Sequence, residues 1–275
     1  MFHPPVAHQS NPHRHFPDRA GWRGLLHALV VPIATAAIDH FAYEGTDARK
    51  LLHDAEFPAD STVVDLASGV GFSPARNGKV TCVDTSQEML TVARLRRPDV
   101  QHFECGNAEE WGEVRLCRHH QFPSIHPRSL FINRSFTRRG PSGALLPRTP
   151  LLHASRRPLL SPALALAPPS PMQTNSFDIA TLMFATHEMP GDARRRCIRN
   201  ALRLARDKVM IVDIWPGFEP NDMMLSGEPY VLNYLENIES DVDSSVDTTQ
   251  WEIERVDVVP QHVRMWKFTR LDWGI

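Results

Sequence analysis

The stretch from Ser61 to Asp84, STVVDLASGVGFSPARNGKVTCVD, restricts the fold of this chain more than any other part of its 275 residues. It opens with a short β-branched apolar run, Thr62 to Leu66, which is typical of a buried strand. A turn rich in small residues follows, and a second apolar run, Val80 to Val83, ends on Asp84. A strand, a tight glycine turn and a second strand ending in an acid form the layout of a nucleotide-binding βαβ unit.

The glycine turn between these strands indicates the kind of nucleotide. Gly69 and Gly71 would let a ligand approach the backbone closely, because they carry no Cβ. A dinucleotide fold uses G-x-G-x-x-G to place a helix N-terminus against the pyrophosphate, whereas this loop lacks the third glycine and is preceded by Asp65. That acid would repel a pyrophosphate but suits a cationic ligand without phosphate. Asp84 could accept hydrogen bonds from both hydroxyls of a ribose.

At these residues the chain resembles the class I S-adenosylmethionine-dependent methyltransferases of the small-molecule type (type 11/25-like), whose first motif reads roughly (Asp/Glu)-x-Gly-x-Gly-x-Gly. Asp65, Gly69 and Gly71 match this motif, and Ala67 takes the place of the first glycine. The run Asp84-Thr85-Ser86-x-x-Met89-Leu90 resembles the second signature, in which the acid binds ribose and the next residues pack near adenine. Asn107-Ala108 stands where the family commonly has Asp-Ala. The resemblance therefore implies these cofactor-binding residues: Asp65, Ala67, Gly69, Gly71, Asp84, Thr85, Met89, Asn107 and Ala108.

One departure from the family concerns the connection after the glycine loop. Only seven residues, Phe72 to Gly78, precede the next strand, where the family usually has a full helix. Asn77-Gly78 is a turn signal. A right-handed parallel crossover normally needs about a dozen residues or more. We therefore expect the first crossover helix to be shortened or absent, and the geometry between the first two strands stays open. Asn107 also has two interpretations, a ligand to the adenine amino group or an ordinary turn residue.

The N-terminal segment predicts a tail and a helical cap. Residues 1–20 are rich in His and Pro and indicate a disordered tail, with a weak organellar leader as the alternative. Residues 21–58 predict a cap of two helices, Gly21 to His40 and Asp47 to Glu56, with Thr46 as N-cap of the second. The apolar run Leu25 to Ile38 is too short for a bilayer span and is interpreted as a buried helix.

Residues 114–173 differ sharply in composition from the rest. They contain nine arginines and many prolines but no Asp, Glu or Lys, so the remainder of the chain is more acidic than the overall net charge of −2. Such a segment predicts a disordered insertion. A nucleic-acid-binding arm is less favoured, because the acidic remainder would repel a polyanion. A third hypothesis is a translated, unspliced intron, since Glu113-Val114-Arg115 can be encoded by a splice-donor sequence and Gln173 by an acceptor end.

The remaining residues complete the expected sheet. We predict strands at Ser176–Ala185, Lys208–Ile214, Trp251–Val259 and His262–Leu271, and helices at Asp192–Ala205 and Tyr230–Ile238. His187 follows the first of these strands, beside the expected position of the methyl group, and is the candidate general base because an unperturbed histidine titrates near neutrality. A structural role for His187 in the loop is the alternative. The arginines 194, 195, 196 and 199 are interpreted as a solvated helix face.

These observations predict an α/β fold: a Rossmann-like, seven-stranded mixed sheet with helices on both faces, formed by residues 21–113 and 174–275. The resemblance implies transfer of a methyl group from S-adenosyl-L-methionine to an O, N or C nucleophile of a small molecule. An inactive ligand-binding protein and an NAD(P)-dependent oxidoreductase are the alternatives. We expect no metal, since no His, Asp and Glu cluster is visible, and no nucleic-acid partner or membrane span. Four separated cysteines indicate a reducing, cytoplasmic location. The oligomeric state stays open.

Overall fold

The computed structural model describes residues 21–41, 43–72, 79–100, 102–112 and 174–271. The predictions for the tail at 1–20, for the segment 114–173 and for most of the short connection after the glycine loop lie outside the described residues.

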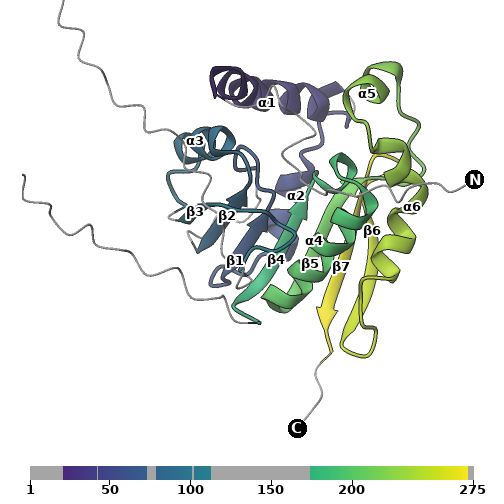
Figure 1. Ribbon diagram of the computed structural model, residues 1–275. Coiled ribbons are helices and arrows are strands. Elements are labelled where there is room, and N and C mark those ends of the chain that lie inside the picture. The colour runs from purple at the N-terminus through teal and green to yellow at the C-terminus, as the bar shows by residue number, and fades with distance from the viewer. Residues whose placement is uncertain (1–20, 42, 73–78, 101, 113–173, 272–275) are drawn as a thin grey trace, which may run out of the picture. The chain divides into compact units, whose positions relative to one another are not determined.

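A seven-stranded mixed sheet forms the centre of the described chain (Figure 1). Its strands are β1 (Val63–Leu66), β2 (Val80–Asp84), β3 (His102–Cys105), β4 (Phe177–Met183), β5 (Ala205–Ile214), β6 (Trp251–Val259) and β7 (Val263–Arg270). They lie in the order β3-β2-β1-β4-β5-β7-β6. The first five pair in parallel, and β7 runs antiparallel to both β5 and β6. The predicted Rossmann-like α/β fold is confirmed.

Helices cover both faces of this sheet, because its central strands are apolar on both sides. The helices are α1 (Gly21–Phe41), α2 (Ala48–Glu56), α3 (Gln87–Arg96), the 3₁₀ helix η3 (Thr186–Glu188), α4 (Gly191–Leu204), α5 (Asp222–Gly227) and α6 (Val231–Asp243). Leu182 of β4 and Ile211 of β5 pack with α4 and α6 on one face of the sheet. Ile179 and Met210, from the same two strands, pack with Leu52 of α2 on the other face. Successive strand side chains point to opposite faces, so both faces are buried, as in parallel sheets generally.

The first two strands form a regular parallel pair in spite of the short connection between them. Val63 pairs with Val80 and Leu66 with Val83. The described part of the connection, residues 67–72, forms turns rather than a helix. The open question about this geometry is therefore answered for the strands: they pair as the family resemblance implies.

Two expected helix boundaries need correction. The N-cap of α2 is Asp47, not Thr46, because the Asp47 carboxylate accepts hydrogen bonds from the backbone N–H groups of Arg49 and Lys50. Residues 222–227, for which no helix was predicted, form α5, which is capped by Asn221: its side-chain oxygen accepts the N–H of Met224. The N-cap of α3 is Ser86, whose hydroxyl accepts the N–H of Met89.

Helix α1 is not the buried helix that its composition suggested. Only Gly24 and Ala28 are buried in it, and Trp22, Ile33 and Phe41 are 72%, 71% and 82% exposed. The sequence pattern misled because α1 is apolar on all sides and so marks no inward face. The helix is also 21 residues long, with a mean hydropathy of 1.5, so by length and composition it could cross a membrane, a test that core helices and signal sequences also pass. The expectation that it is too short is therefore wrong.

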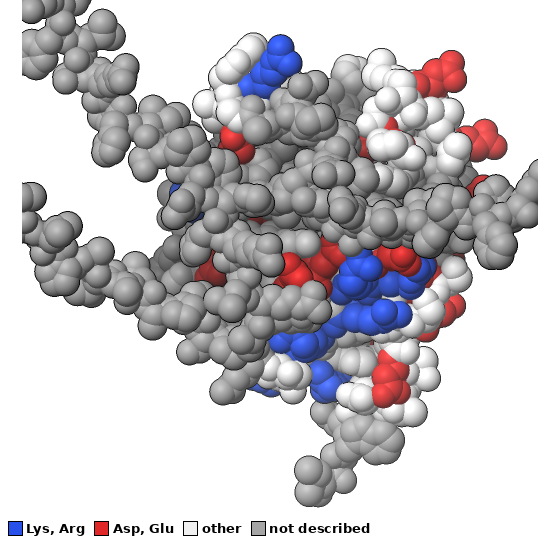
Figure 2. Space-filling view, in the orientation of Figure 1, with Lys and Arg blue, Asp and Glu red and all other residues white. Residues whose placement is uncertain are grey.

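The arginines of α4 are not a plain solvated face either. Arg194 is fully buried, with its Nε atom 2.7 Å from Oδ2 of Asp241. Arg195 pairs with the same carboxylate, and Arg196 pairs with Glu109. Figure 2 shows basic side chains gathered over α4 with acidic side chains alongside. Sequence spacing alone could not reveal these partners, because they lie 46, 47 and 87 positions away in the chain.

Candidate functional site

The glycine loop after β1 adopts the backbone conformation that its sequence requires. Ala67, Gly69 and Gly71 all have positive φ, at 56°, 53° and 79°. Glycine adopts this left-handed region readily, whereas alanine does so at a cost of roughly 1–2 kcal/mol. A Cβ at Gly71 would also lie 3.2 Å from Cβ of Ala93 in α3. The loop is therefore folded tightly against α3, and Ala67 has a backbone conformation that favours glycine.

The Asp84 carboxylate connects this loop with the start of α3. One carboxylate oxygen accepts the backbone N–H of Gly69 at 2.8 Å, and the other accepts the N–H of Ser86 at 2.8 Å. The Asp84 carbonyl accepts the N–H of Gly106, which begins the loop after β3. The ends of three neighbouring strands thus meet at Asp84. The carboxylate is therefore fixed in place at the shared edge of β1, β2 and β3.

Asp65 lies in β1, directly before the glycine loop. Its side chain belongs to a residue only 2% exposed, and its Oδ1 atom accepts the hydroxyl of Thr181 at 2.6 Å. Because Thr181 is in β4, this bond ties the two central strands of the sheet together. The described contact of Asp65 is thus structural, between β1 and β4.

The other predicted cofactor residues surround the same sheet edge. Thr85 follows Asp84 directly, and Met89 packs against the cluster of Ala28, Val70 and Val92 that joins α1, the glycine loop and α3. Asn107 forms a turn, because its side-chain oxygen accepts the N–H of Glu109 at 3.1 Å. Ala108 is buried, and its carbonyl accepts the amide of Asn200. The turn interpretation of Asn107 is therefore directly visible, while its adenine role stays a prediction.

Arg49 of α2 lies over this loop and was missed by sequence reasoning. Its guanidinium is 4.8 Å from the ring centroid of Phe72, after the loop, and 4.4 Å from that of Phe184, after β4. Asp39 forms an ion pair with it at 3.2 Å. The Nε atom of Arg49 is buried and has no acceptor among the described residues. Nothing in the sequence pattern distinguished this arginine from a surface residue.

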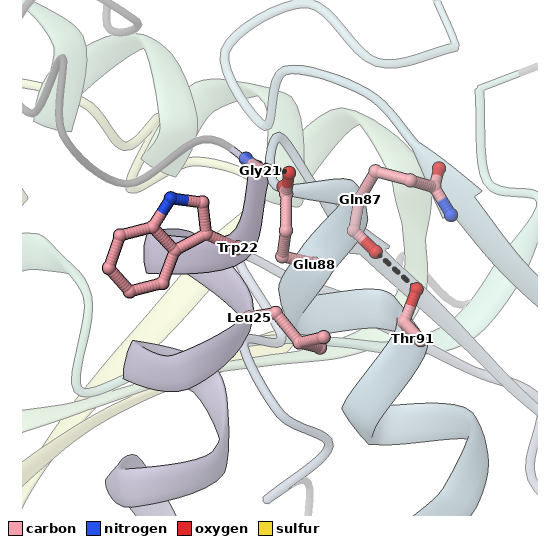
Figure 3. A pocket seen from close by; sticks show the side chains of 6 residues that line it. All are labelled: Gly21, Trp22, Leu25, Gln87, Glu88 and Thr91. Atoms are coloured by element: carbon pink, nitrogen blue, oxygen red, sulfur yellow. Dashed lines mark hydrogen bonds between the residues drawn. The ribbon is translucent and has the colours of Figure 1, made fainter. Parts of the chain in front are cut away.

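A shallow pocket of about 290 Å³ lies between the starts of α1 and α3 (Figure 3). Gly21, Trp22 and Leu25 line one side, and Gln87, Glu88 and Thr91 the other. The Glu88 carboxylate accepts the N–H of Gly21 at 2.7 Å, which holds the two helices together there. No predicted cofactor residue lines this pocket, so it adjoins the predicted site rather than forming it.

His187 lies in η3, directly after β4, and contacts the end of β5. Its Nδ1 atom is 2.6 Å from Oδ1 of Asp213. The other oxygen of Asp213 accepts the hydroxyl of Thr186 at 2.5 Å and its backbone N–H at 2.8 Å. The His187 ring meets the Tyr234 ring of α6 edge to face, with centroids 6.2 Å apart. The imidazole is therefore fixed in orientation by β5 and α6.

This environment changes the expected chemistry of His187. Burial alone would lower the pKa of His187, but the charge of Asp213 and its hydrogen bond outweigh burial and raise the pKa to about 9. Burial works in the opposite direction on Asp213, and the same pairing keeps the pKa of that carboxyl below its usual range. The imidazole is therefore protonated at neutral pH in this state and would have to lose that proton to act as a base, so a catalytic role of His187 stays a prediction.

Two glutamates complete the surroundings of His187. Glu188 is the next residue in η3, and Glu228 lies between α5 and α6. One ligand atom from each of His187, Glu188 and Glu228 lies within 4.8 Å of the other two. The expectation that the chain has no His and acid cluster is therefore wrong. The cluster escaped notice because Glu228 is far from His187 in sequence and is brought close by the turn between α5 and α6.

Comparison with known proteins gives a fold. No family model matches the chain, and no curated protein matches it. Among solved structures, it is similar to a Haloferax volcanii protein named as a methyltransferase and solved with the Trm112 methyltransferase activator, at 11% identity over 90% of this chain and 97% of that one, with a TM-score of 0.50.

Two further solved structures are similar to the chain at lower scores. An S-adenosylmethionine-dependent methyltransferase from Aquifex aeolicus shares 14% identity over 82% of this chain and 90% of that one, with a TM-score of 0.45. The Synechocystis magnesium protoporphyrin IX methyltransferase, solved with S-adenosylhomocysteine, shares 12% over 90% and 85%, with a TM-score of 0.41. Together with the sheet order, the Haloferax likeness defines the class: the chain has the class I S-adenosylmethionine-dependent methyltransferase fold.

Proposed function

We propose that this protein binds S-adenosylmethionine at the carboxyl ends of β1, β2 and β3 and transfers its methyl group to a small-molecule acceptor. The observation that carries the proposal is Asp84, whose carboxylate is fixed between the glycine loop and α3. In open α/β sheets, ligands bind at this edge, where the strand order reverses. In this sheet the order reverses between β1 and β4. Strands β2 and β3 follow on the far side of β1, and β5 lies on the far side of β4.

The residues at this edge fit the proposed cofactor. Asp84 would accept the ribose hydroxyls, and Gly69, where a Cβ would meet nothing within 4 Å, leaves room beside the backbone. The buried Nε atom of Arg49, which has no acceptor among the described residues, suits the carboxylate of the methionine part. When bound, the cofactor supplies a methyl group on a sulfonium, ready for in-line displacement. Thr85, Met89, Asn107 and Ala108 keep their proposed places around the adenine.

The residues of this chain contribute mainly by positioning. Asp84 and the glycine loop would orient the cofactor, and the fixed imidazole of His187 would orient the acceptor on the β4 side. We propose His187 as an acceptor-positioning residue, because Asp213 and Tyr234 fix the orientation of its ring. The nature of the nucleophile, O, N or C, belongs to the acceptor.

Calorimetric titration of the full chain with S-adenosylhomocysteine and, separately, with NADH tests the proposal. We expect micromolar binding of S-adenosylhomocysteine and no binding of NADH, because the loop lacks the third glycine of a dinucleotide fold. Asp84→Asn should weaken the binding at least about tenfold, since hydrogen bonds to a charged group contribute about 1.5–3 kcal/mol. Asp60→Asn, a fully exposed acid before β1, is the matched control and should bind normally.

Three results would change the conclusion. Binding of NADH alone would favour the oxidoreductase. Absence of binding by a folded chain would favour a protein without the cofactor site. Binding of S-adenosylhomocysteine that Asp84→Asn leaves unchanged would move the site away from this sheet edge.

We also propose that residues 114–173 are an insertion in a loop that closes without them. Arg203 of α4 supports this, because it contacts both flanks of the segment. Its guanidinium donates to the Trp111 carbonyl at 2.9 Å, and its own carbonyl accepts the N–H of Asn175 at 2.9 Å. A variant that joins Glu113 to Thr174 should unfold at the same urea concentration as the full chain and bind S-adenosylhomocysteine at least as well. A lower midpoint would contradict the insertion, and sequencing the transcript tests the intron hypothesis.

A further inference from the structure

A compact group of metal-ligating side chains lies at the carboxyl edge of β4, outside the predicted cofactor residues. His187 and Glu188 come from η3, and Glu228 comes from the junction of α5 and α6. Their ligand atoms all lie within 4.8 Å of one another. The His187 side chain is only 12% exposed, and both glutamates are half-buried, so this is not a chance meeting of surface acids.

A carboxylate holds the imidazole through one of its two ring nitrogens. Its Nδ1 atom is held by Asp213 at 2.6 Å, which leaves Nε2 as the ring nitrogen that can bind an ion. Asp213 is itself fixed, because Thr186 and the backbone N–H of Ile214 donate to it. A carboxylate that holds the far nitrogen of a histidine is the usual support of a metal-bound imidazole, since it fixes the ring and raises its basicity.

The composition of the group selects the kind of ion. One imidazole and two carboxylates form a mixed nitrogen and oxygen set, which suits Zn²⁺ or a similar divalent transition metal better than the all-oxygen preference of Ca²⁺ or Mg²⁺. Ligands about 2.1 Å from a tetrahedral ion lie about 3.4 Å apart, so small rotations of the two flexible glutamates would close the site. Three protein ligands leave a coordination position open.

We propose that His187, Glu188 and Glu228 bind a divalent transition-metal ion, with Asp213 as the carboxylate that positions the histidine. The ion would take the place of the proton on His187 and balance the two glutamates. The role of the ion rests on the proposed function: at the acceptor side of the sheet edge it would be a Lewis acid for an acceptor oxygen. The binding of the ion does not depend on that function.

The test is a Co²⁺ titration of the full chain after removal of bound metals with a chelator. The visible absorption of Co²⁺ reports its coordination, and Zn²⁺ should displace it. Since the first twenty residues contain His3, His8, His13 and His15, which also bind these ions, the comparison between variants decides. Glu228→Gln and His187→Gln should each weaken the assigned site at least tenfold. Glu236→Gln, an exposed acid of α6, is the matched control and should change nothing.

Asp213→Asn should weaken binding by about 10–100-fold and shift the Co²⁺ spectrum, which a merely structural role would not do. The proposal is overturned if the full chain binds no more Co²⁺ than the His187→Gln and Glu228→Gln variants, in which case the group is an internal ion pair. A titration with S-adenosylhomocysteine on the same samples separates the two proposals, because metal binding without cofactor binding would refute the proposed function alone.

Discussion

The two halves of the described chain differ in how their buried side chains pack. In the C-terminal half, residues 174–271, the core contains large side chains that are fully buried, such as Leu182, Ile198 and Trp266, and an ion pair without solvent contact. In the N-terminal half, residues 21–112, the cluster joining α1, the glycine loop and α3 has only Ala28, Val70 and Val92 as buried members. Leu66 and Leu90 of this half are also fully buried, so the contrast concerns α1, which few buried side chains hold against the glycine loop and α3. Ligand binding should therefore stabilise this region around α1 more than the C-terminal core.

The largest effect that this comparison predicts is loss of the buried ion pair in the C-terminal half. Asp241→Asn should lower the free energy of unfolding by about 3–5 kcal/mol, because Arg194 would keep a buried charge without its carboxylate. Urea unfolding measures this. Asp243→Asn is the matched control, since Asp243 pairs with Arg255 at an exposed position and should matter little. Equal losses of unfolding free energy in the two variants would show that burial does not make the Arg194–Asp241 pair more important than the exposed pair.

A cavity in each half tests the same contrast directly. Leu182→Ala, in β4, should lower the free energy of unfolding by about 2–5 kcal/mol, because the side chains packed around Leu182 cannot move in to fill the cavity. Val92→Ala, in α3, removes fewer atoms from a smaller cluster and should cost roughly a third of that. Thermal or urea unfolding of both variants gives the ratio. A larger loss for Val92→Ala would mean that the N-terminal half is the better packed of the two.

The sequence predicted what is local and missed what is assembled from distant residues. The strands β1 and β2, the glycine loop and the position of Asp84 follow from apolar runs and turn chemistry within about twenty residues, and all were predicted. The partner of Arg194 and the approach of Glu228 to His187 depend on how α4, α5 and α6 pack, which no local pattern encodes. The prediction that α1 is buried was wrong for a third reason: an evenly apolar helix has no polar and apolar faces that indicate which side is buried.

Titration of His187, in the C-terminal half, should make the free energy of unfolding depend on pH. The pKa of His187 is raised to about 9 from an unfolded value near 6.5, with Asp213, Glu188 and Glu228 facing it. Its contribution to folding is therefore full below about pH 6.5 and is lost as the pH rises through 9. With a chelator present, the wild type should lose on the order of 1–3 kcal/mol more than His187→Gln between these values. Parallel losses in both proteins would place the titration elsewhere.

The smallest effect concerns Ala67, which takes the place of the first glycine of the family motif. Ala67 has a φ of 56°, which costs an alanine roughly 1–2 kcal/mol, but a glycine loses about 0.5–1 kcal/mol more in unfolded-chain entropy. Ala67→Gly should therefore stabilise the protein by about 0.5 kcal/mol. Gly71→Ala is the opposite test, since it adds both a positive φ and a close approach to Ala93, and it should destabilise. If Ala67→Gly instead destabilises the protein, the alanine methyl group makes favourable packing contacts. The glycine loop would then be better packed than the small cluster joining it to α1 and α3 indicates.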